Sequence, residues 1–286
     1  LSVYLGDQLE KVFEDIKEGK LTGSEAGGLT DVGLTQILDF ERDPGDRNRT
    51  SPFAFTGNRF EFRAVGSSQS VSGPLVAMNT MLADSLNWIA GKLEAELSSG
   101  KEQTAAVITV LQDLMGKHGN AVFGGDGYSS EWHEMAVKER GLKNIPTTAD
   151  ALPALQEASV KELFESTGVL SPIELESRYE VYAEQYILSI EVEAKLVVEM
   201  AKSTIYPAAL HYMTGLADAN ASMASMDIEL DNSVAKTVAT ASNSMMAAVT
   251  KLSTAMEKEG FASTEEHMQH CANEIRSLMD EVRLHA

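Results

Sequence analysis

The five residues Arg59-Phe60-Glu61-Phe62-Arg63 form the pattern in this sequence that best suits chemistry. Side chains alternate between the two faces of a strand, so Arg59, Glu61 and Arg63 are expected on one face and the two phenylalanines on the other. Glutamate oxygens are hard ligands for Mg²⁺ or Mn²⁺, and guanidinium groups match the geometry of phosphate. This strand therefore suits a site that holds a metal ion and a phosphate.

Two further arginines, Arg47 and Arg49, precede the strand and add positive charge near the same carboxylate. The pattern also has a simpler explanation, because alternating charges on an exposed strand form ion pairs that contribute little to stability. The spacing of the residues leaves both explanations open. One is a site for a metal and a phosphate, and the other is a surface strand with a ladder of ion pairs.

Two short strands are expected to position these side chains. Residues 51–55 and 59–65 have the composition of strands, and Thr56-Gly57-Asn58 between them is a loop of hairpin length in which glycine can adopt a positive φ. These are the only convincing strand signals in the sequence. The predicted fold class is therefore α+β and predominantly α, with a small antiparallel β segment followed by a bundle of long helices.

Amphipathic patterns predict helices over most of the remaining chain. Apolar residues three or four positions apart predict a first helix from about Val3 to Lys20, and Pro74 marks the start of a long helical region. A second helix is expected over residues 103–118, and a short one over residues 131–140.

The last part of the chain begins with a strong helix-start signal. Ser171-Pro172-Ile173-Glu174 combines an N-cap serine, a proline at the first helical position and a glutamate at the third. The apolar residues that follow recur every three or four positions for many turns, so one face of this helix should be buried. Pro207 is expected to kink or end the helix, because proline lacks a backbone N–H.

Two more long helices complete the expected bundle. One covers about residues 228–258, and the other starts at Ser263, with Glu266 as the second residue of a capping box, and ends near residue 284. We therefore predict two domains, residues 1–170 and a long-helix domain of residues 171–286.

Composition and charge limit the class of protein. Hydrophobic residues make up 43% of the 286 residues, and 43 acidic against 23 basic residues give a formal net charge of −20, which repels nucleic acid and anionic membranes. No apolar window is long enough to span a membrane, and the first residues lack a signal-peptide pattern. The single cysteine, Cys271, fits a reducing compartment. We expect a soluble, cytoplasmic protein without a nucleic-acid or membrane partner.

Several separated segments of the sequence resemble the type III glutamine synthetases. NRTSPFAFTG and RFEFRAVGSSQSVSGP are similar to the family signature, and GDGYSSEWHEMAVKERGLKN, TTADALPAL and LESRYEVYAEQY are similar to later family segments in the same order. The resemblance implies the C-terminal part of a homo-oligomeric enzyme that ligates ammonia to glutamate. In this family ATP phosphorylates the γ-carboxylate of glutamate, ammonia displaces the phosphate, and Mg²⁺ or Mn²⁺ holds the nucleotide phosphates.

The resemblance also assigns roles to individual residues. Glu61 matches the family glutamate that binds the metal between the β- and γ-phosphates. Arg63 matches the arginine that contacts the transferred phosphoryl group and the substrate, and Arg49 matches the arginine that approaches the γ-phosphate. The resemblance thus implies Arg63 and Arg49 as catalytic residues, Arg49, Arg47 and Arg59 as ATP-binding residues, and Glu61 as a metal ligand.

The sequence departs from the family pattern in two respects. Ala54 stands where the better-known bacterial enzymes have a further arginine, and the other metal-binding glutamates and a histidine of the family site have no convincing counterpart. Because phosphoryl transfer needs a full set of metal ligands, the chain alone is expected to be inactive. The alternative function is a non-catalytic helical interaction module from the same family. Residues 171–286 are expected to serve assembly rather than chemistry.

Two other patterns are interpreted as structural. His267, His270 and Cys271 have a spacing compatible with part of a soft metal site on a helix, but a single cluster of this kind favours an ordinary bundle contact, so no zinc site is expected. The glycine-rich segment 124–127 lacks the Gly-Lys-Ser/Thr of a phosphate-binding loop and is interpreted as a connector.

Overall fold

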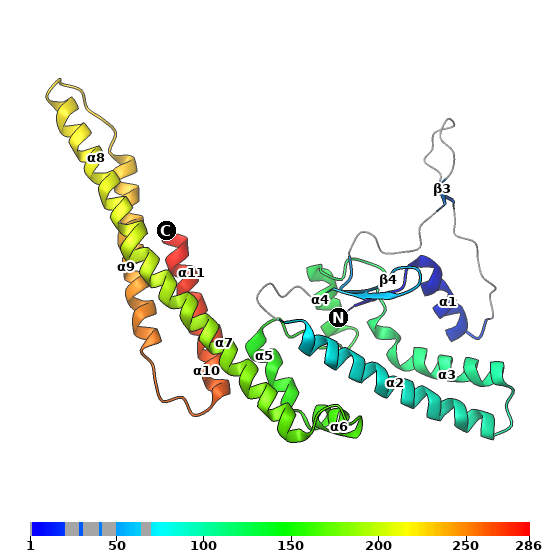
Figure 1. Ribbon diagram of the computed structural model, residues 1–286. Helices are drawn as coiled ribbons and strands as arrows, with labels where there is room; N and C mark the ends of the chain where they lie inside the picture. The colour runs from blue at the N-terminus through cyan, green and yellow to red at the C-terminus, as the bar shows by residue number, and fades with distance from the viewer. Residues whose placement is uncertain (1, 21–28, 31–39, 42–49, 64–69) are drawn as a thin grey trace. The chain divides into compact units, whose positions relative to one another are not determined.

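The computed structural model of the chain describes residues 2–20, 29–30, 40–41, 50–63 and 70–286 (Figure 1). The chain forms two compact units, Leu1–Asn144 and Ile145–Ala286, each with its own internal contacts. Most of the described residues are helical, and the first unit also contains a small sheet. The predicted fold class, α+β and predominantly α, is confirmed.

A three-stranded sheet with the order β1-β4-β5 lies in the first unit. Its strands are β1 (Val3–Tyr4), β4 (Phe53–Phe55) and β5 (Phe60–Phe62). β4 and β5 are antiparallel, with Ala54 opposite Glu61, and Gly57 in the connecting loop has a φ of 98°. That conformation favours glycine because it has no Cβ. The predicted hairpin is confirmed.

The prediction that the first helix starts near Val3 is wrong. Val3 and Tyr4 form β1, which pairs in parallel with β4, and helix α1 covers only Asp7–Lys17. A strand of two residues is too short to show alternation, and its partner lies far along the chain, so local periodicity gives no signal for it. The strands β2 (Leu29–Thr30) and β3 (Phe40–Glu41) form a second, antiparallel sheet. These two strands also lie outside the predicted ones.

Close packing holds the start of β4 in place. The Gly127 N–H donates a hydrogen bond to the Thr50 carbonyl oxygen at 2.7 Å, and a Cβ on Gly127 would lie 2.0 Å from Ser2 Oγ. Only glycine fits such an approach. Ser2 and Ser51, both without exposed surface, share a hydrogen bond of 3.2 Å between their hydroxyl oxygens. The glycine-rich segment thus packs against the residues that lead into the hairpin.

The helices of the first unit other than α1 follow the sheet along the chain. They are α2 (Ser72–Ser98), α3 (Gln103–His118), the 3₁₀ turn η1 (Gly119–Ala121) and α4 (Ser130–Lys138). The bounds of α3 are those predicted, and α4 agrees within a few residues. α1 and α2 both pack against α3, which buries Ala106, Val110 and Met115.

In the second unit the described residues form helices and connecting loops and no strand. Its elements are α5 (Thr148–Ala151), η2 (Leu152–Gln156), α6 (Ala158–Ser166), α7 (Pro172–Met200), η3 (Ala201–Ile205), α8 (Tyr206–Ala224), α9 (Ser233–Met256), α10 (Thr264–His270), η4 (Cys271–Ile275) and α11 (Arg276–His285). The short elements before residue 171 pack against α7. The domain boundary at residues 170 and 171 stays a prediction.

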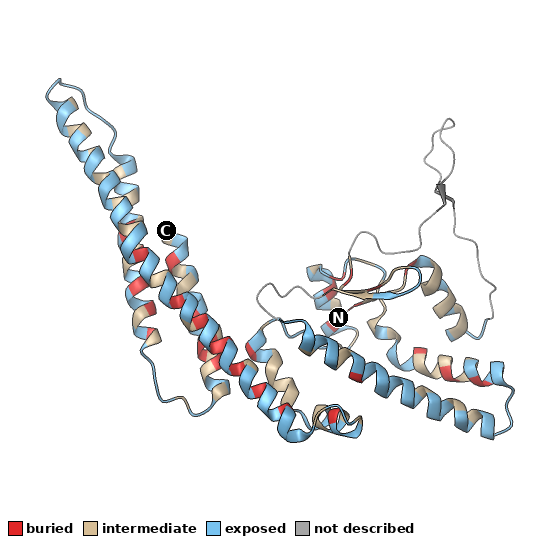
Figure 2. Ribbon diagram, in the orientation of Figure 1, coloured by how far each residue is buried: buried red, intermediate tan, exposed pale blue. Residues whose placement is uncertain are grey.

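The core of the second unit lies between α7, α9 and the run from α10 to α11. Figure 2 shows buried residues along the facing sides of these helices. Alanines such as Ala183 and Ala248 let the helices approach closely, and Leu252 and Met268, which have no exposed surface, fill the space between them. The predicted bundle of long helices is confirmed.

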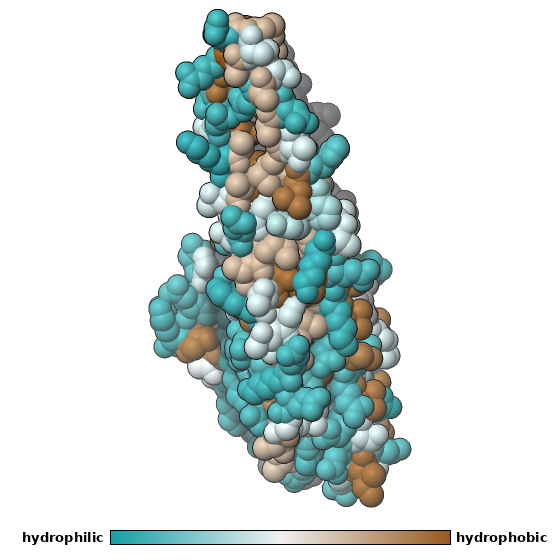
Figure 3. Space-filling model, turned by 90° about the vertical axis from the view of Figure 1, so that its left-hand side faces the viewer, coloured by the Kyte–Doolittle hydropathy of each residue, from teal (hydrophilic) through white to brown (hydrophobic). Residues whose placement is uncertain are grey.

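The outer helix α8 contrasts with this core. It packs against α9 but contains no buried residue, and Leu210 and Tyr212 remain 43% and 51% exposed. Figure 3 shows apolar and hydrophilic residues interspersed over the face in view. Among the described helices, none combines the length and apolar character needed to cross a membrane.

The two predicted capping boxes, at Ser171 and Ser263, differ in one hydrogen bond. Ser171 and Glu174 form the reciprocal capping box: Ser171 Oγ accepts from the Glu174 N–H at 3.3 Å, and Glu174 Oε2 accepts from the Ser171 N–H at 2.8 Å. That second bond lowers the pKa of Glu174. Ser263 Oγ likewise accepts from the Glu266 N–H at 3.1 Å, but the Glu266 carboxylate accepts from the Ala262 N–H at 2.7 Å. The first bond of the second predicted capping box is therefore present, and the reciprocal bond is made to the residue before the N-cap.

The sequence predicts that Pro207 kinks or ends its helix. Pro207 does not end it. The helical run continues from α7 through the π-helical turn η3 into α8, and the Tyr206 N–H bonds to the Ala201 carbonyl five residues earlier. Proline has no N–H to donate the usual helical hydrogen bond, and its ring would clash with the carbonyl group four residues earlier in an α-helical turn. The wider π-helical turn directly before Pro207 avoids this clash.

Burial of Cys271 makes its thiol a poor nucleophile. The residue is 1% exposed, and burial, assisted by the Glu191 charge, raises the pKa of its thiol to about 11. Because the thiolate is the reactive form, we expect the folded chain to react very slowly with a chromogenic disulfide reagent at pH 8 and fully in denaturant. The absorbance of the released thiolate measures the reaction of the folded and of the denatured chain. Reaction of the folded chain at the rate of the denatured chain would contradict the burial.

Candidate functional site

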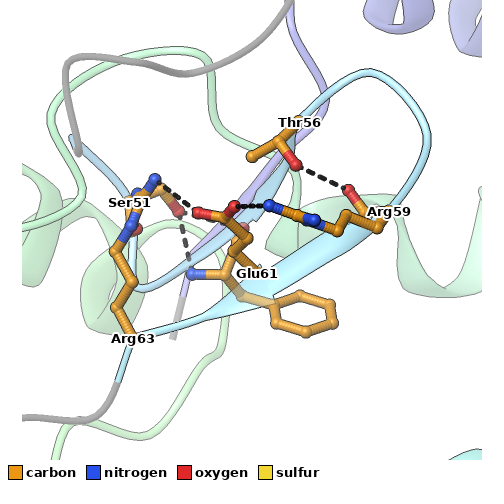
Figure 4. A network of polar contacts seen from close by, with 6 residues as sticks. Ser51, Thr56, Arg59, Glu61 and Arg63 are labelled. Carbon is orange, nitrogen blue, oxygen red and sulfur yellow. Dashed lines mark hydrogen bonds and ion pairs between the residues drawn. The ribbon is translucent and has the colours of Figure 1, made fainter.

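Arg59, Glu61 and Arg63 lie on one face of the hairpin, as the alternation predicts (Figure 4). The Glu61 carboxylate lies between the two guanidinium groups. Arg59 Nη2 is 2.9 Å from Glu61 Oε1, and Arg63 Nη2 is 3.4 Å from Glu61 Oε2. The structure thus brings together the three predicted site residues that it describes.

The two arginines are held to different degrees. The Arg63 side chain is 18% exposed, and its Nη1 donates a hydrogen bond of 2.8 Å to the Ser51 carbonyl oxygen, whereas the Arg59 side chain is 71% exposed. The Arg63 guanidinium is therefore positioned by the residues just before β4. Sequence reasoning did not find this function of Ser51, because a backbone carbonyl oxygen leaves no side-chain signature.

The charge of Glu61 is stabilised by its neighbours. The hydrogen bond from Arg59 lowers the pKa of the Glu61 carboxyl, and the positive charges of Arg59 and Arg63 act in the same direction against a partial loss of solvation. The carboxylate is therefore ionised at neutral pH. An ionised, partly exposed carboxylate can serve as a hard ligand for Mg²⁺ or Mn²⁺.

Ala54 lies beside this carboxylate. It occupies the central strand, opposite Glu61 on one side and Tyr4 on the other, and has no exposed surface. Directly opposite residues of an antiparallel pair point to the same face. The resemblance implies an arginine at this position in the better-known bacterial enzymes, whereas this hairpin has only a buried methyl group there.

An aromatic cluster supports the hairpin on its other face. The ring of Phe60 stacks on Phe53 with centroids 5.0 Å apart, and it contacts Phe55 at 5.4 Å. Phe62 meets Phe53 edge to face at 6.4 Å. Cross-strand aromatic pairs stabilise one register of an antiparallel pair, and this register determines the position of the Glu61 carboxylate.

The remaining predicted site residues, Arg47 and Arg49, lie outside the residues that the structure describes. Their roles stay predictions. Within the described ranges, no cluster of three or more His, Cys, Asp or Glu side chains is arranged to hold a metal ion. In that part of the chain, Glu61 forms its ion pairs with Arg59 and Arg63.

The histidines of the last helices make contacts within the bundle. His267 Nε2 lies 3.3 Å from Glu191 Oε1. His270 is buried, with Nε2 3.0 Å from the Ala255 carbonyl oxygen and Nδ1 3.0 Å from Glu274 Oε2. These contacts join the last helices to α7 and α9, which agrees with the interpretation of these residues as bundle contacts.

Comparison with known proteins places the chain in a family. Residues 106–224 match the model of the glutamine synthetase C-terminal domain. The chain is 39% identical over 218 residues to the type-3 glutamine synthetase of Dictyostelium discoideum, which covers 76% of this chain and 29% of that protein. A glutamine synthetase of Bacteroides fragilis is 33% identical over 220 residues, or 76% of this chain and 30% of the relative. One of Butyrivibrio fibrisolvens is 31% identical over 291 residues, or 100% of this chain and 41% of the relative.

The chain belongs to the glutamine synthetase family, and the resemblance to the type III enzymes is confirmed. It spans between 29% and 41% of the length of these relatives. The match to the C-terminal domain extends from α3 in the first unit to the end of α8 in the second.

Proposed function

We propose that this chain is the C-terminal part of a glutamate–ammonia ligase, a type III glutamine synthetase. The reaction joins ammonia to L-glutamate with ATP and gives L-glutamine through γ-glutamyl phosphate. The observation that carries the proposal is the Glu61 carboxylate held between Arg59 and Arg63 in a chain of this family. The hydrogen bond from Arg63 to the Ser51 carbonyl oxygen supports an active-site wall over a surface ladder of ion pairs, because it holds the guanidinium group in one position.

Each site residue has a role in this proposal. Glu61 contributes one ligand to the Mg²⁺ or Mn²⁺ ion, and its hard, ionised oxygens fit such an ion. Arg63 contacts the phosphoryl group that is transferred, and Arg59, Arg47 and Arg49 bind the phosphates of ATP, with Arg49 directed to the γ-phosphate. Phosphoryl transfer is catalysed mainly by positioning and by cations that face the developing negative charge.

The anchored guanidinium of Arg63 suits this role. Its hydrogen bond to Ser51 fixes its position before the substrate arrives, so no reorganisation is needed when charge develops on the phosphoryl group. Arg59 is mostly exposed and can exchange its contact with Glu61 for a contact with a phosphate. The metal, when bound, would neutralise charge on the nucleotide phosphates.

The oligomeric state, compartment and partners of the enzyme are also proposed. We propose a homo-oligomer in the cytoplasm, with glutamate and ammonia as substrates and no nucleic-acid or membrane partner. The net charge of −20 supports the last point, because it opposes association with anionic polymers and surfaces.

We expect the isolated 286-residue chain to fold but to show no synthetase activity, because Glu61 is only part of the metal-ligand set that phosphoryl transfer requires. A γ-glutamyl transfer assay and an ATP-dependent synthesis assay should give background values, with the full-length protein as the positive control. Turnover by the chain alone would contradict the proposal. An inactive full-length protein with an intact Glu61 would favour the alternative, a non-catalytic helical interaction module.

A further inference from the structure

A glycine far along the chain packs directly against the residues that hold Arg63. The Gly127 N–H donates a hydrogen bond to the Thr50 carbonyl oxygen at 2.7 Å. The next carbonyl oxygen along the chain, that of Ser51, accepts from Arg63 Nη1 at 2.8 Å. The backbone N–H of Arg63 also donates to the Pro52 carbonyl oxygen at 2.8 Å. Gly127 is therefore one peptide group away from the contact that positions the Arg63 guanidinium.

The segment that leads to Gly127 is hydrogen-bonded to β1. Val122 forms a parallel bridge with Val3, and the Phe123 N–H donates to the Val3 carbonyl oxygen at 3.0 Å. Arg140 Nη1 donates to the Val122 carbonyl oxygen at 2.7 Å, and the Arg140 guanidinium lies 5.8 Å from the centroid of the Phe123 ring. Contacts with the sheet and with Arg140 thus hold this segment in place before it reaches Gly127.

Glycine is required at position 127 by its contacts and not by its backbone conformation. The φ of Gly127 lies outside the left-handed region that favours glycine. A Cβ at this position would lie 2.0 Å from Ser2 Oγ, 3.1 Å from Ser2 Cβ and 3.3 Å from the Thr50 carbonyl oxygen. The first distance is far below any van der Waals contact, so a larger residue would displace Ser2 or the backbone around Gly127.

Ser2 is in turn coupled to Ser51. Neither residue has exposed surface, and their hydroxyl oxygens are 3.2 Å apart. A hydrogen bond of 3.1 Å also joins the Ser51 hydroxyl to the Ser2 carbonyl oxygen. A methyl group on Gly127 would therefore displace Ser2, Thr50 or both, and through them the Ser51 carbonyl oxygen that holds Arg63.

We propose that Gly127 is a positioning residue for phosphoryl transfer, which acts through Ser51 on the guanidinium group of Arg63. The inference rests on the proposed function, in which Arg63 contacts the phosphoryl group that is transferred. Stabilisation of developing charge depends on groups that are held in place beforehand, and a misplacement of about 1 Å can lower the rate by about 10²-fold. Gly127, which lies in the segment interpreted from the sequence as a connector, thus contributes to the site without contacting substrate.

The first test measures the position of Arg63 without catalysis. A dicarbonyl reagent modifies accessible guanidinium groups, and peptide mass spectrometry gives the rate at each arginine of the 286-residue chain. In Gly127→Ala the rate at Arg63 should rise by about fivefold, the factor that corresponds to the loss of one hydrogen bond of ordinary net strength. The exposed Arg59 and the Arg140 that is bound to Val122 should react as before the substitution.

The second test measures catalysis in the full-length enzyme. Gly127→Ala should lower kcat by about tenfold or more. The KM for ATP should change little, because the proposed function assigns the nucleotide phosphates to other arginines than Arg63. Ser2→Gly removes the two side-chain atoms closest to the added methyl group, so Gly127→Ala in a Ser2→Gly background should have little effect on kcat or on the reaction of Arg63.

Gly125→Ala is the matched control for both tests. It adds the same methyl group in the same segment, but the three atoms nearest to its Cβ belong to the Phe123 ring, the closest at 2.6 Å. That ring stacks on Trp132 with centroids 4.3 Å apart, so the control disturbs the packing of the segment and its closest contact is not with Ser2. The rate at Arg63 and kcat should both stay nearly unchanged.

Four results would overturn the inference. The first is Gly127→Ala with an unchanged rate at Arg63, and the second is an equal rise at Arg63 and Arg140, which would show a general loosening of the segment. The third is an equal effect of Gly127→Ala with and without Ser2→Gly. The fourth is a faster reaction at Arg63 with unchanged kcat in an enzyme in which Glu61→Ala lowers kcat.

Failure of the proposed function would give a different result. In that case Glu61→Ala would keep a normal kcat, whatever the rate of modification of Arg63 in Gly127→Ala.

Discussion

Replacing Glu61 by alanine in the full-length enzyme is expected to lower kcat by about 10²-fold or more, the size of effect seen when one strong electrostatic contribution to a reaction is removed. The substitution removes a metal ligand and leaves Arg59 and Arg63 without the carboxylate between them. Thermal stability should change far less, because exposed ion pairs contribute little. Steady-state kinetics at several Mg²⁺ concentrations measure the effect.

The chain offers a matched control for this experiment. Glu134 on α4 also forms an ion pair, 2.7 Å from the ammonium group of Lys138, but it lies on an exposed helix and is not part of the hairpin. Glu134→Ala should leave kcat nearly unchanged. If Glu61→Ala behaves like this control and keeps its metal dependence, Glu61 is a structural ion-pair residue and the proposed metal role is wrong.

Replacing Leu252 by alanine should lower the free energy of unfolding of the second unit by about 2–5 kcal/mol. Leu252 has no exposed surface and belongs to the core between α7, α9 and the last helices. The substitution removes apolar contacts and leaves a cavity that the packed helices can close only in part. Urea unfolding followed by far-ultraviolet circular dichroism measures the loss.

Leu284→Ala is the control for this prediction, because Leu284 is 79% exposed and the same change removes little buried surface. The two tryptophans, Trp88 and Trp132, both lie in the first unit. Their fluorescence therefore follows the unfolding of that unit and should not change in Leu252→Ala. A loss of stability in the tryptophan signal equal to that in circular dichroism would show that the two units unfold together.

Much of the fold follows from local signals. The caps at Ser171 and Ser263, the apolar spacing of the long helices and the alternation along residues 59–63 each depend on neighbours within a few positions, and the structure contains the corresponding elements. The juxtaposition of Arg59 and Glu61 follows from the same alternation.

The remaining features depend on contacts between distant residues. β1 is only two residues long and is defined by its pairing with β4, and the anchoring of Arg63 uses the carbonyl of Ser51. Neither has a pattern in the surrounding sequence. The roles of the site residues came from the resemblance to a family, because the spacing of the charges also fits a surface strand.

The π-helical turn Cys271–Ile275 has a consequence for how this chain tolerates a change of length. A π turn takes up one more residue than an α turn for the same rotation. Deleting the exposed Asn273 would convert it to an ordinary turn and leave the faces of α11 where they are. Deleting Ser277 within α11 would instead rotate all later residues by about 100° and turn the buried Val282 out of the core. The turn is therefore the position in this helical run where loss of a residue disturbs the packing least.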